Sequence, residues 1–241
     1  MPARAEAALR VDAQYGGRVE PQGPKLAEGR DSEIFEHGPG RVLRRARDGR
    51  SLVREADVMR HVREHGYPAP EVFDAGEGWL VMERLDGRDM LADMRRTPRG
   101  VTTAAHQLAG LHRQLGEITA PEWMDAAPGP DGDRVVHLDL HPLNVMSTAD
   151  GLVVIDWANA RRGDPATDVA NTWSLLACAD PPGGLVDRAL VAIARGLLLR
   201  AFLASVDRAA AQRAMPALVE WRVQDRNHSD AERRRIRRLA G

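Results

Sequence analysis

Two apolar runs of this 241-residue chain each end in polar residues, and this pair of features most constrains the fold. The first run leads into HLDLHPLNV, residues 137–145, and the second, VVIDW, contains Asp156. Alternating apolar and polar residues are typical of β-strands, and Pro142 interrupts such a strand because proline has no N–H to donate. We therefore expect a short β pair, RVVHLDL with GLVVIDW.

The first third of the chain alternates between strand and helix patterns. KLAEGRDSEIFEHGPGRVLRRAR has β-compatible runs joined at Gly38-Pro39-Gly40, which indicates a hairpin. SLVREADVMRHVREH places apolar residues at helical spacing, and Gly66 stands where a helix would end. EVFDAG and GWLVMERL then read as two more strands. The predicted order is strand, strand, strand, helix, strand, strand.

The rest of the chain is mostly helical in pattern. TTAAHQLAGLHRQLGEI keeps its apolar residues on one stripe, and everything after about Asp164 reads as helices. Residues 1–23 are rich in Ala, Gly, Pro and charge, so we expect a flexible N-terminal extension, with a short helix as the alternative.

Composition narrows the class of protein. The formal net charge of −1 gives no overall attraction to nucleic acid or to an anionic membrane. Cys178 is the only cysteine, which excludes an intramolecular disulfide framework and fits a reducing cytoplasm. The first twenty residues lack the apolar core of a signal peptide, and Arg195 and Arg200 interrupt the most apolar later run. We expect a soluble, cytoplasmic protein without a membrane partner.

Metal-bound hydrolysis, general acid/base work and phosphoryl transfer could each use the polar set around residue 140. His137, Asp139 and His141 would share one face of a strand, as metal ligands might. Pro142 breaks that strand at once, however, and a metal hydrolase leaves Asn144 and Asp156 unexplained.

Phosphoryl transfer explains more of the residues. A kinase site needs a carboxylate that orients the acceptor hydroxyl, an Asn and an Asp that hold magnesium, and a cation paired with a Glu. The D-x-x-x-x-N spacing from Asp139 to Asn144, followed by Asp156 after a β run, matches this set. Together with READVMRHV and VVIDWANARRGDPATDVA, HLDLHPLNV resembles the aminoglycoside phosphotransferase family, over about residues 25 to 175.

The resemblance implies a bilobal α+β, protein-kinase-like fold. A small N-terminal lobe with an antiparallel β-sheet and one helix would span residues 24–85, with a hinge at 82–86. A larger, mainly helical lobe over residues 87–241 would carry catalysis and acceptor binding. ATP and Mg2+ are the implied cofactors.

The resemblance also implies roles for residues in the larger lobe. Asp139 resembles the catalytic base, and Asn144 and Asp156 resemble the magnesium ligands. Asp168 resembles a buried carboxylate that receives N–H groups of the catalytic loop. The expected loop-ordering hydrogen-bond partners are His137 and His141.

In the smaller lobe, Arg44 stands where the family has a lysine on the third strand, and Glu55 resembles its partner on the helix. A solvated strand arginine is the alternative for Arg44. The phosphate loop has no G-x-G-x-x-G pattern and offers only AEGRDSE. The remaining nucleotide contacts implied by the resemblance are Ser32 in that loop, Ile34 and Val42 against adenine, and Met82, Glu83 and Leu85 in the hinge. Two further departures are Leu138 and Leu143, where the family often has glycine.

The acceptor is constrained by length and charge. Only seven residues separate Asp156 from Asp164, which leaves no room for a protein-kinase activation segment and indicates a small acceptor. Residues 181–241 contain 6 Asp/Glu against 12 Arg, which favours a neutral or anionic hydroxylated acceptor over a polycationic aminoglycoside. The candidate wall residues are Trp173, Trp221 and Asp225, although residues of these types more often belong to the core or the surface than to a ligand site.

The leading hypothesis is an ATP-dependent O-phosphotransferase that acts on a small hydroxylated molecule. A nucleotide-binding pseudokinase or scaffold is the alternative, because the glycine loop is missing and Arg44 replaces lysine. A third hypothesis makes the arginine-rich stretch 233–238 a nucleic-acid contact, although the overall charge makes that partner less favoured. The sequence leaves open the identity of the acceptor, the choice between ATP and GTP, and the oligomeric state.

Overall fold

The structure is a computed structural model that describes residues 19–29, 31–97, 99–178, 185–224 and 229–240. The predicted N-terminal extension lies almost entirely outside these ranges. Among the helices that the structure describes, none combines the length and the apolar character needed to cross a membrane.

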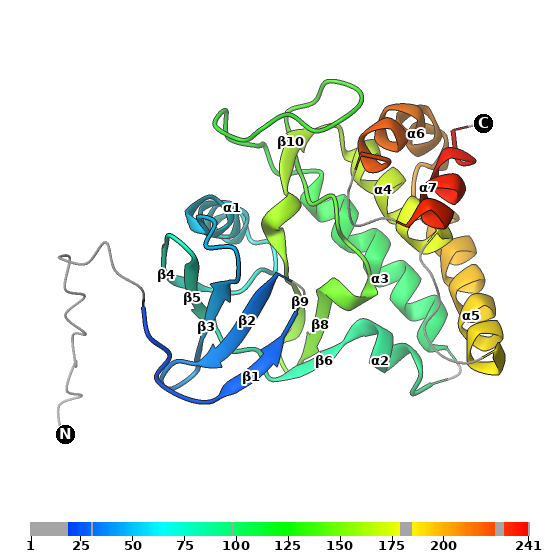
Figure 1. Cartoon of the computed structure of the whole chain (residues 1–241). Coiled ribbons are helices and arrows are strands. Elements are labelled where there is room, and N and C mark those ends of the chain that lie inside the picture. Colours follow the sequence, from blue (N-terminus) through cyan, green and yellow to red (C-terminus); the bar gives the residue numbers. More distant parts are fainter. Residues whose placement is uncertain (1–18, 30, 98, 179–184, 225–228, 241) are drawn as a thin grey trace.

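The first part of the chain forms a five-stranded antiparallel sheet with one helix beside it (Figure 1). The strand order is β1-β2-β3-β5-β4, and the order of elements along the chain is the one predicted. The hairpin between β2 and β3 turns through Gly38 and Gly40, whose positive φ angles of 78° and 68° favour glycine. The elements are β1 (Lys25–Glu28), β2 (Ser32–Glu36), β3 (Arg41–Ala46), α1 (Val53–Glu64), β4 (Val72–Gly76) and β5 (Trp79–Glu83).

The register of this sheet brings distant residues onto one face. Ile34 lies opposite Arg44, and Val42 lies opposite Met82. Because cross-strand partners share a face and side chains alternate along a strand, all four side chains point to the same side. Ser32, two residues before Ile34, joins them.

The second part of the chain is mainly helical, so the predicted α+β class is confirmed. In Figure 1 the longer helices gather on the side away from the five-stranded sheet, with β6, β8 and β9 between them and that sheet. The elements are β6 (Gly87–Asp89), α2 (Met90–Met94), α3 (Gly100–Leu115), β7 (Arg134–Val136), η1 (Pro142–Asn144), β8 (Val145–Thr148), β9 (Gly151–Val154), η2 (Trp157–Asn159), β10 (Arg161–Gly163), α4 (Pro165–Cys178), α5 (Leu185–Leu203), α6 (Arg208–Arg222) and α7 (Asp230–Arg237).

The predicted pairing of RVVHLDL with GLVVIDW is wrong. β7 pairs with β10, whereas β9 pairs with β8, which in turn pairs with β6. A tight turn that ends at Gly151 folds β9 back onto the preceding strand. Asp156 then adopts a left-handed conformation (φ 63°, ψ 68°) that redirects the chain, so that the next strand, β10, returns to β7.

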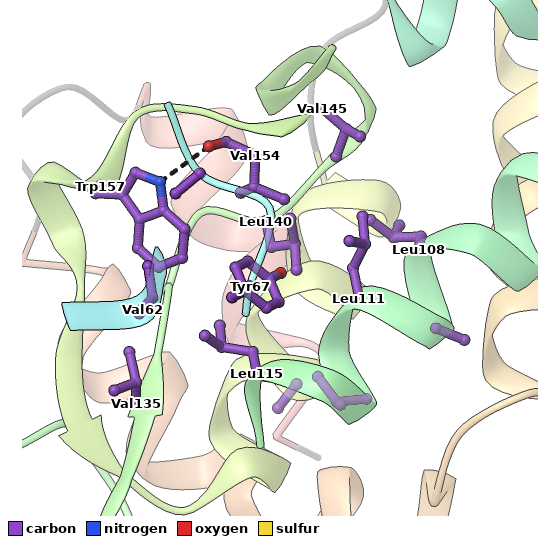
Figure 2. Close-up of a cluster of buried hydrophobic side chains, with 14 of the residues drawn as sticks. Val62, Tyr67, Leu108, Leu111, Leu115, Val135, Leu140, Val145, Val154 and Trp157 are labelled. Atoms are coloured by element: carbon purple, nitrogen blue, oxygen red, sulfur yellow. Dashed lines mark hydrogen bonds between the residues drawn. The ribbon is translucent and has the colours of Figure 1, made fainter. Parts of the chain in front are cut away.

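The core under the two short sheets is organised around Trp157, which is 1% exposed (Figure 2). The indole Nε1 donates to the Val154 carbonyl at 2.9 Å, and its ring meets Tyr67 edge-on with centroids 5.6 Å apart. Val62 of α1 lies on one side of this cluster, while α3 contributes Leu108, Leu111 and Leu115. The core therefore joins α1 to the strands that carry the polar residues of interest.

Trp157→Ala should lower the free energy of unfolding by about 3–5 kcal/mol, because it removes a large buried ring and leaves a cavity. Trp157→Phe should lower the free energy of unfolding clearly less, because phenylalanine keeps an aromatic ring in the core. Its cost comes from the smaller ring and from the lost Nε1 hydrogen bond. Urea denaturation of both variants measures the difference. A loss below about 1 kcal/mol for the alanine variant would show that this ring does not organise the core.

Candidate active site

The loop after β7 is held in place from α4. Leu138 has a left-handed backbone (φ 56°), and its N–H donates to Asp168 Oδ1 at 2.7 Å. Asn171 Nδ2 donates to the Leu138 carbonyl at 2.5 Å, and Thr172 Oγ1 donates to the Leu140 carbonyl at 2.6 Å. Residues with a Cβ are disfavoured in this left-handed conformation. The side chains of α4 therefore stabilise a strained loop path.

A second layer of polar groups supports these α4 side chains. Arg222 of α6 donates from Nη1 to Asn171 Oδ1 at 2.7 Å. The Thr172 hydroxyl donates its proton to the loop, so His112 Nε2, 2.9 Å away, is the donor in their contact. His112 Nδ1 lies 3.3 Å from Asp168 Oδ2. The whole network is buried, which makes each of its hydrogen bonds costly to lose.

Asp168 stays ionised in this network. Burial by itself raises the pKa of the carboxyl, but His112, His137 and the Leu138 N–H outweigh it and hold the pKa below the ordinary aspartate value. Asp168 is therefore a charged group that accepts the Leu138 N–H and positions the loop.

His137 is also committed to the loop. Its Nε2 donates to the Ile155 carbonyl at 3.2 Å, and its Nδ1 accepts the Asp139 N–H at 3.2 Å. This pattern needs a neutral ring, and burial lowers the pKa of His137 accordingly. Both nitrogens are thus occupied, which argues against the metal-ligand trio of His137, Asp139 and His141. No set of three or more His, Cys, Asp or Glu side chains in the described ranges is arranged to hold a metal.

The Asp139 carboxylate lies at the open side of the loop. Asn144 Nδ2 donates to Asp139 Oδ2 at 3.1 Å and to its carbonyl at 2.9 Å. His141 accepts the Leu143 N–H on Nδ1, so its proton is on Nε2, which lies 3.5 Å from Asp139 Oδ1. Burial lowers the pKa of His141 to about 4, so the ring is neutral at pH 7.

The pKa of Asp139 is raised to about 7, mainly by burial and then by the negative charge of Asp156. The positive charge of Arg222 and the hydrogen bond from Asn144 lower it in part. Asp139 and Asp156 therefore lie close enough to repel each other, which is the arrangement that a bound cation would relieve.

Asn144 and Asp156 supply oxygen donors from two separate segments. The Ile155 N–H donates to the Asn144 carbonyl at 3.0 Å, which ties the loop to the end of β9. Because Asn144 spends both Nδ2 protons on Asp139, its Oδ1 is left as an acceptor. The Asp156 side chain is 44% exposed. One amide oxygen and one carboxylate suit magnesium, which takes few protein ligands and keeps water or phosphate oxygens.

Arg44 connects this site to the five-stranded sheet and to α1. Its side chain is buried and forms an ion pair through Nη1 with Glu55 of α1. Nη2 lies 3.3 Å from Asp156 Oδ1, and Nε donates to Ser32 Oγ at 3.2 Å. Arg44 is therefore not a solvated strand arginine. Burial alone lowers the pKa of Arg44, but the two carboxylates outweigh it and raise the pKa above the ordinary value.

The other predicted nucleotide residues line the sheet face beside Arg44 and the segment after β5. Ile34, Val42 and Met82 share that face, as the register shows. Glu83 accepts the Glu71 N–H on Oε2 at 3.0 Å. Within the described residues the Leu85 N–H has no protein acceptor. In the predicted phosphate loop, the Gly29 N–H donates to the Ser32 carbonyl at 2.8 Å.

The structure thus brings the predicted residues of both parts of the chain to one place through the contacts of Arg44. Of the predicted wall residues that the structure describes, none forms a hydrogen bond with Asp139, Asn144 or Asp156. The Arg208 guanidinium carbon lies 5.4 Å from the centroid of the Trp173 ring, and Trp221 is half-buried. Asp225 lies outside the described residues.

No role was predicted for Asn171, Thr172 or Arg222. The signal that was available is the spacing of Asp168, Asn171 and Thr172, which puts three polar side chains on one face of a helix. Such a polar stripe beside a buried carboxylate indicates a hydrogen-bonded network.

The comparisons with known proteins agree with this geometry. The model of the phosphotransferase enzyme family (APH) matches residues 24–134 and 122–203. A search of curated protein sequences gave no match.

Solved structures of similar fold include aminoglycoside phosphotransferases. A thermostable mutant of APH(4)-Ia, in a ternary complex with AMP-PNP and hygromycin B, is 17% identical with a TM-score of 0.63, over 90% of this chain and 92% of that chain. The gentamicin complex of APH(2")-IIa is 16% identical with a TM-score of 0.57, over 90% of this chain and 87% of that chain. The streptomycin–ATP complex of APH(2")-IIa is 16% identical with a TM-score of 0.52, over 82% of each chain. The fold is therefore kinase-like, and the chain belongs to the phosphotransferase enzyme family.

Proposed function

We propose that this protein is an ATP-dependent O-phosphotransferase that moves the γ-phosphoryl group to a hydroxyl of a small molecule. The observation that carries the proposal is the convergence on Arg44. The guanidinium joins Glu55 of α1 to Asp156, Asn144 donates to the Asp139 carboxylate, and the negative charge of Asp156 raises the pKa of that carboxyl. Phosphoryl transfer depends mainly on positioning and on neutralising charge, and this set supplies both.

The nucleotide would lie between the five-stranded sheet and the loop after β7. The apolar side chains of Ile34, Val42 and Met82 offer a surface for adenine, and the Leu85 N–H is available to its edge. The phosphates would then reach Arg44 and Ser32. The guanidinium carries five N–H groups, so it can keep its protein partners and still donate to phosphate oxygens.

Asn144 Oδ1 and Asp156 would hold magnesium, whose charge would neutralise the phosphate oxygens when it is bound. Asp139 would orient the acceptor hydroxyl and accept its proton. The residues that fix Asp139 act before any substrate arrives, because His137 and Asn144 already hold its backbone and side chain. Such preorganisation lowers the barrier without reorganisation during the reaction.

We propose a neutral or anionic acceptor rather than an aminoglycoside. Arginine outnumbers acidic residues by 12 to 6 over residues 181–241. The positive charge of Arg222 also acts on the Asp139 carboxyl, where it lowers the pKa in part. A polycation would be repelled by this positive field near the reacting group.

A nucleotide-binding protein without turnover is a second candidate, because the Arg44 guanidinium bonds to Asp156 Oδ1 and the phosphate loop is degenerate. Both candidates allow ATP to bind, so only turnover separates them.

ATP should raise the melting temperature, and magnesium should add to that shift in the wild type but not in Asp156→Ala. The same variant should lose at least about 100-fold in turnover, because a charge-neutralising group is missing. Asp150→Ala, in the exposed β8–β9 turn, is the matched control and should behave as the wild type. A magnesium-dependent shift that survives in Asp156→Ala would refute the metal assignment.

Arg44→Ala should lower kcat/KM for ATP by about 30-fold or more, the equivalent of about 2 kcal/mol, because it leaves Glu55 buried without its partner. Arg44→Lys should retain more activity, since an ammonium can meet Glu55 or phosphate but cannot also reach Asp156. Arg45→Ala is the control, because Arg45 points to the opposite face and pairs with Glu33 at 3.1 Å. Equal losses at both positions would contradict a specific role for Arg44.

An array of hydroxylated acceptors with radioactive ATP should show phosphorylation of neutral or anionic compounds and little of aminoglycosides. Competition by an aminoglycoside should be weak for the electrostatic reason given above. Tight aminoglycoside competition would overturn the acceptor proposal while leaving the kinase proposal in place.

A further inference from the structure

The segment between α3 and β7, residues 116–133, is here called the connector. It has little regular structure and forms the green loop near β10 at the top of Figure 1. Its first part follows β7, since Val135 N–H donates to the Ile118 carbonyl at 3.0 Å and Ala120 N–H to the Asp133 carbonyl at 2.7 Å. The connector is thus attached by its backbone to the mainly helical part of the molecule.

The next part of the connector follows β10. Arg162 N–H donates to the Asp125 carbonyl at 2.9 Å, and Ala127 N–H donates to the Arg162 carbonyl at 2.7 Å. β10 begins five residues after Asp156. The connector is therefore anchored to the strand that follows the proposed magnesium ligand.

The opposite side of the connector holds α1. His61 Nε2 donates to the Thr119 carbonyl at 2.8 Å, and Arg54 Nη2 donates to the Trp123 carbonyl. The Arg54 guanidinium also lies 5.8 Å from the centroid of the Trp123 ring. Arg54 is the residue before Glu55, so these contacts fix the turn of α1 that presents Glu55 to Arg44.

That turn needs support from outside the helix. The residue at the start of α1 is Leu52, which has no side-chain group to accept from the first N–H groups of the helix. Apolar side chains are buried along the whole of α1, from Leu52 and Ala56 at its start to Met59 and Val62 farther on, but they leave these first N–H groups without a side-chain acceptor. The connector thus contacts the first turn, where the helix lacks a cap of its own.

Asp125 links the two anchored elements. Its Oδ1 lies 3.0 Å from Arg54 Nη2 of α1, and its Oδ2 lies 3.1 Å from Arg161 Nη1 of β10. One carboxylate thus bridges Arg54, on the helix that carries Glu55, and Arg161, on the strand that follows Asp156. Both pairs are partly exposed, so each alone is weak, and their effect comes from the shared carboxylate and the accompanying carbonyl contacts.

We propose that Asp125 is a positioning residue that keeps α1 in the arrangement required for the Arg44–Glu55 pair. In regulated protein kinases, a phosphate on the activation segment orders that segment through pairs with arginine and controls the corresponding helix. Here the segment from Asp156 to Asp164 is too short to hold such a site. The Asp125 carboxylate supplies a negative charge between α1 and β10, so the site needs no phosphorylation to be assembled. This inference rests on the proposed function for its kinetic consequence only.

The test compares Asp125→Asn and Arg54→Ala with the wild type by amide hydrogen exchange of α1 in the free protein. Exchange over residues 53–64 should become about threefold faster or more in both variants, with little change in α3 or α4. Arg60→Ala is the matched control: its pair with Asp57 at 3.0 Å stays within α1, so exchange should change by about twofold at most. Exchange unchanged in both variants, or raised uniformly over the whole chain, would overturn the proposal.

The kinetic arm measures KM for ATP and kcat separately. Both variants should raise KM for ATP about threefold or more, and Asp125→Glu should restore most of it, because a carboxylate is again available. A KM for ATP as low in Asp125→Asn as in Asp125→Glu would show that the charge of Asp125 is not required. Hydrogen exchange needs no turnover, so a protein that phosphorylates nothing would defeat the proposed function while the exchange result still decides the role of Asp125.

Discussion

The contact of one guanidinium with three separate segments is the interaction on which the rest of the site depends. Arg44 meets Ser32 on β2, Glu55 on α1 and Asp156 after β9, the last of them 112 residues away in the sequence. The planar fork can reach several partners in fixed directions, which an ammonium cannot. Because Arg44 and Glu55 are both buried, each charge needs the other: either one left without its partner there would cost several kcal/mol. The lysine-to-arginine departure is thus consistent with a site in which the cation also has a structural task.

The other half of the site depends on α4. Asp168, Asn171 and Thr172 satisfy the backbone of a loop that passes through a left-handed Leu138, and His112 and Arg222 satisfy the α4 side chains in turn. A buried network of this kind is favourable only when each member has a partner. Asp139, whose side chain is 24% exposed, therefore stands on a rigid support, and the strain at Leu138 is held where the proposed chemistry occurs.

The similarity to aminoglycoside phosphotransferases at 16–17% identity shows how little of the sequence the fold requires. Shape alone does not identify a substrate, since one fold supports many chemistries. We base the proposed acceptor class on the charge of residues 181–241 and on the positive charge of Arg222, and the proposed role of Asp125 on the contacts of the connector. These charges and contacts belong to this chain itself.

The sequence by itself determined the order of strands and helices in the first part of the chain, the hairpin at Gly38 and Gly40, and the residue types of the candidate site, because these depend on local periodicity, turn chemistry and motif spacing. Only the tertiary structure decided that β7 pairs with β10, that Arg222 supports Asn171, and that Asp125 joins α1 to β10. The left-handed backbone at Asp156 leads into β10, which pairs with β7. The physical reason is that each of these contacts joins residues far apart in the sequence, so no local periodicity or turn signal indicates it.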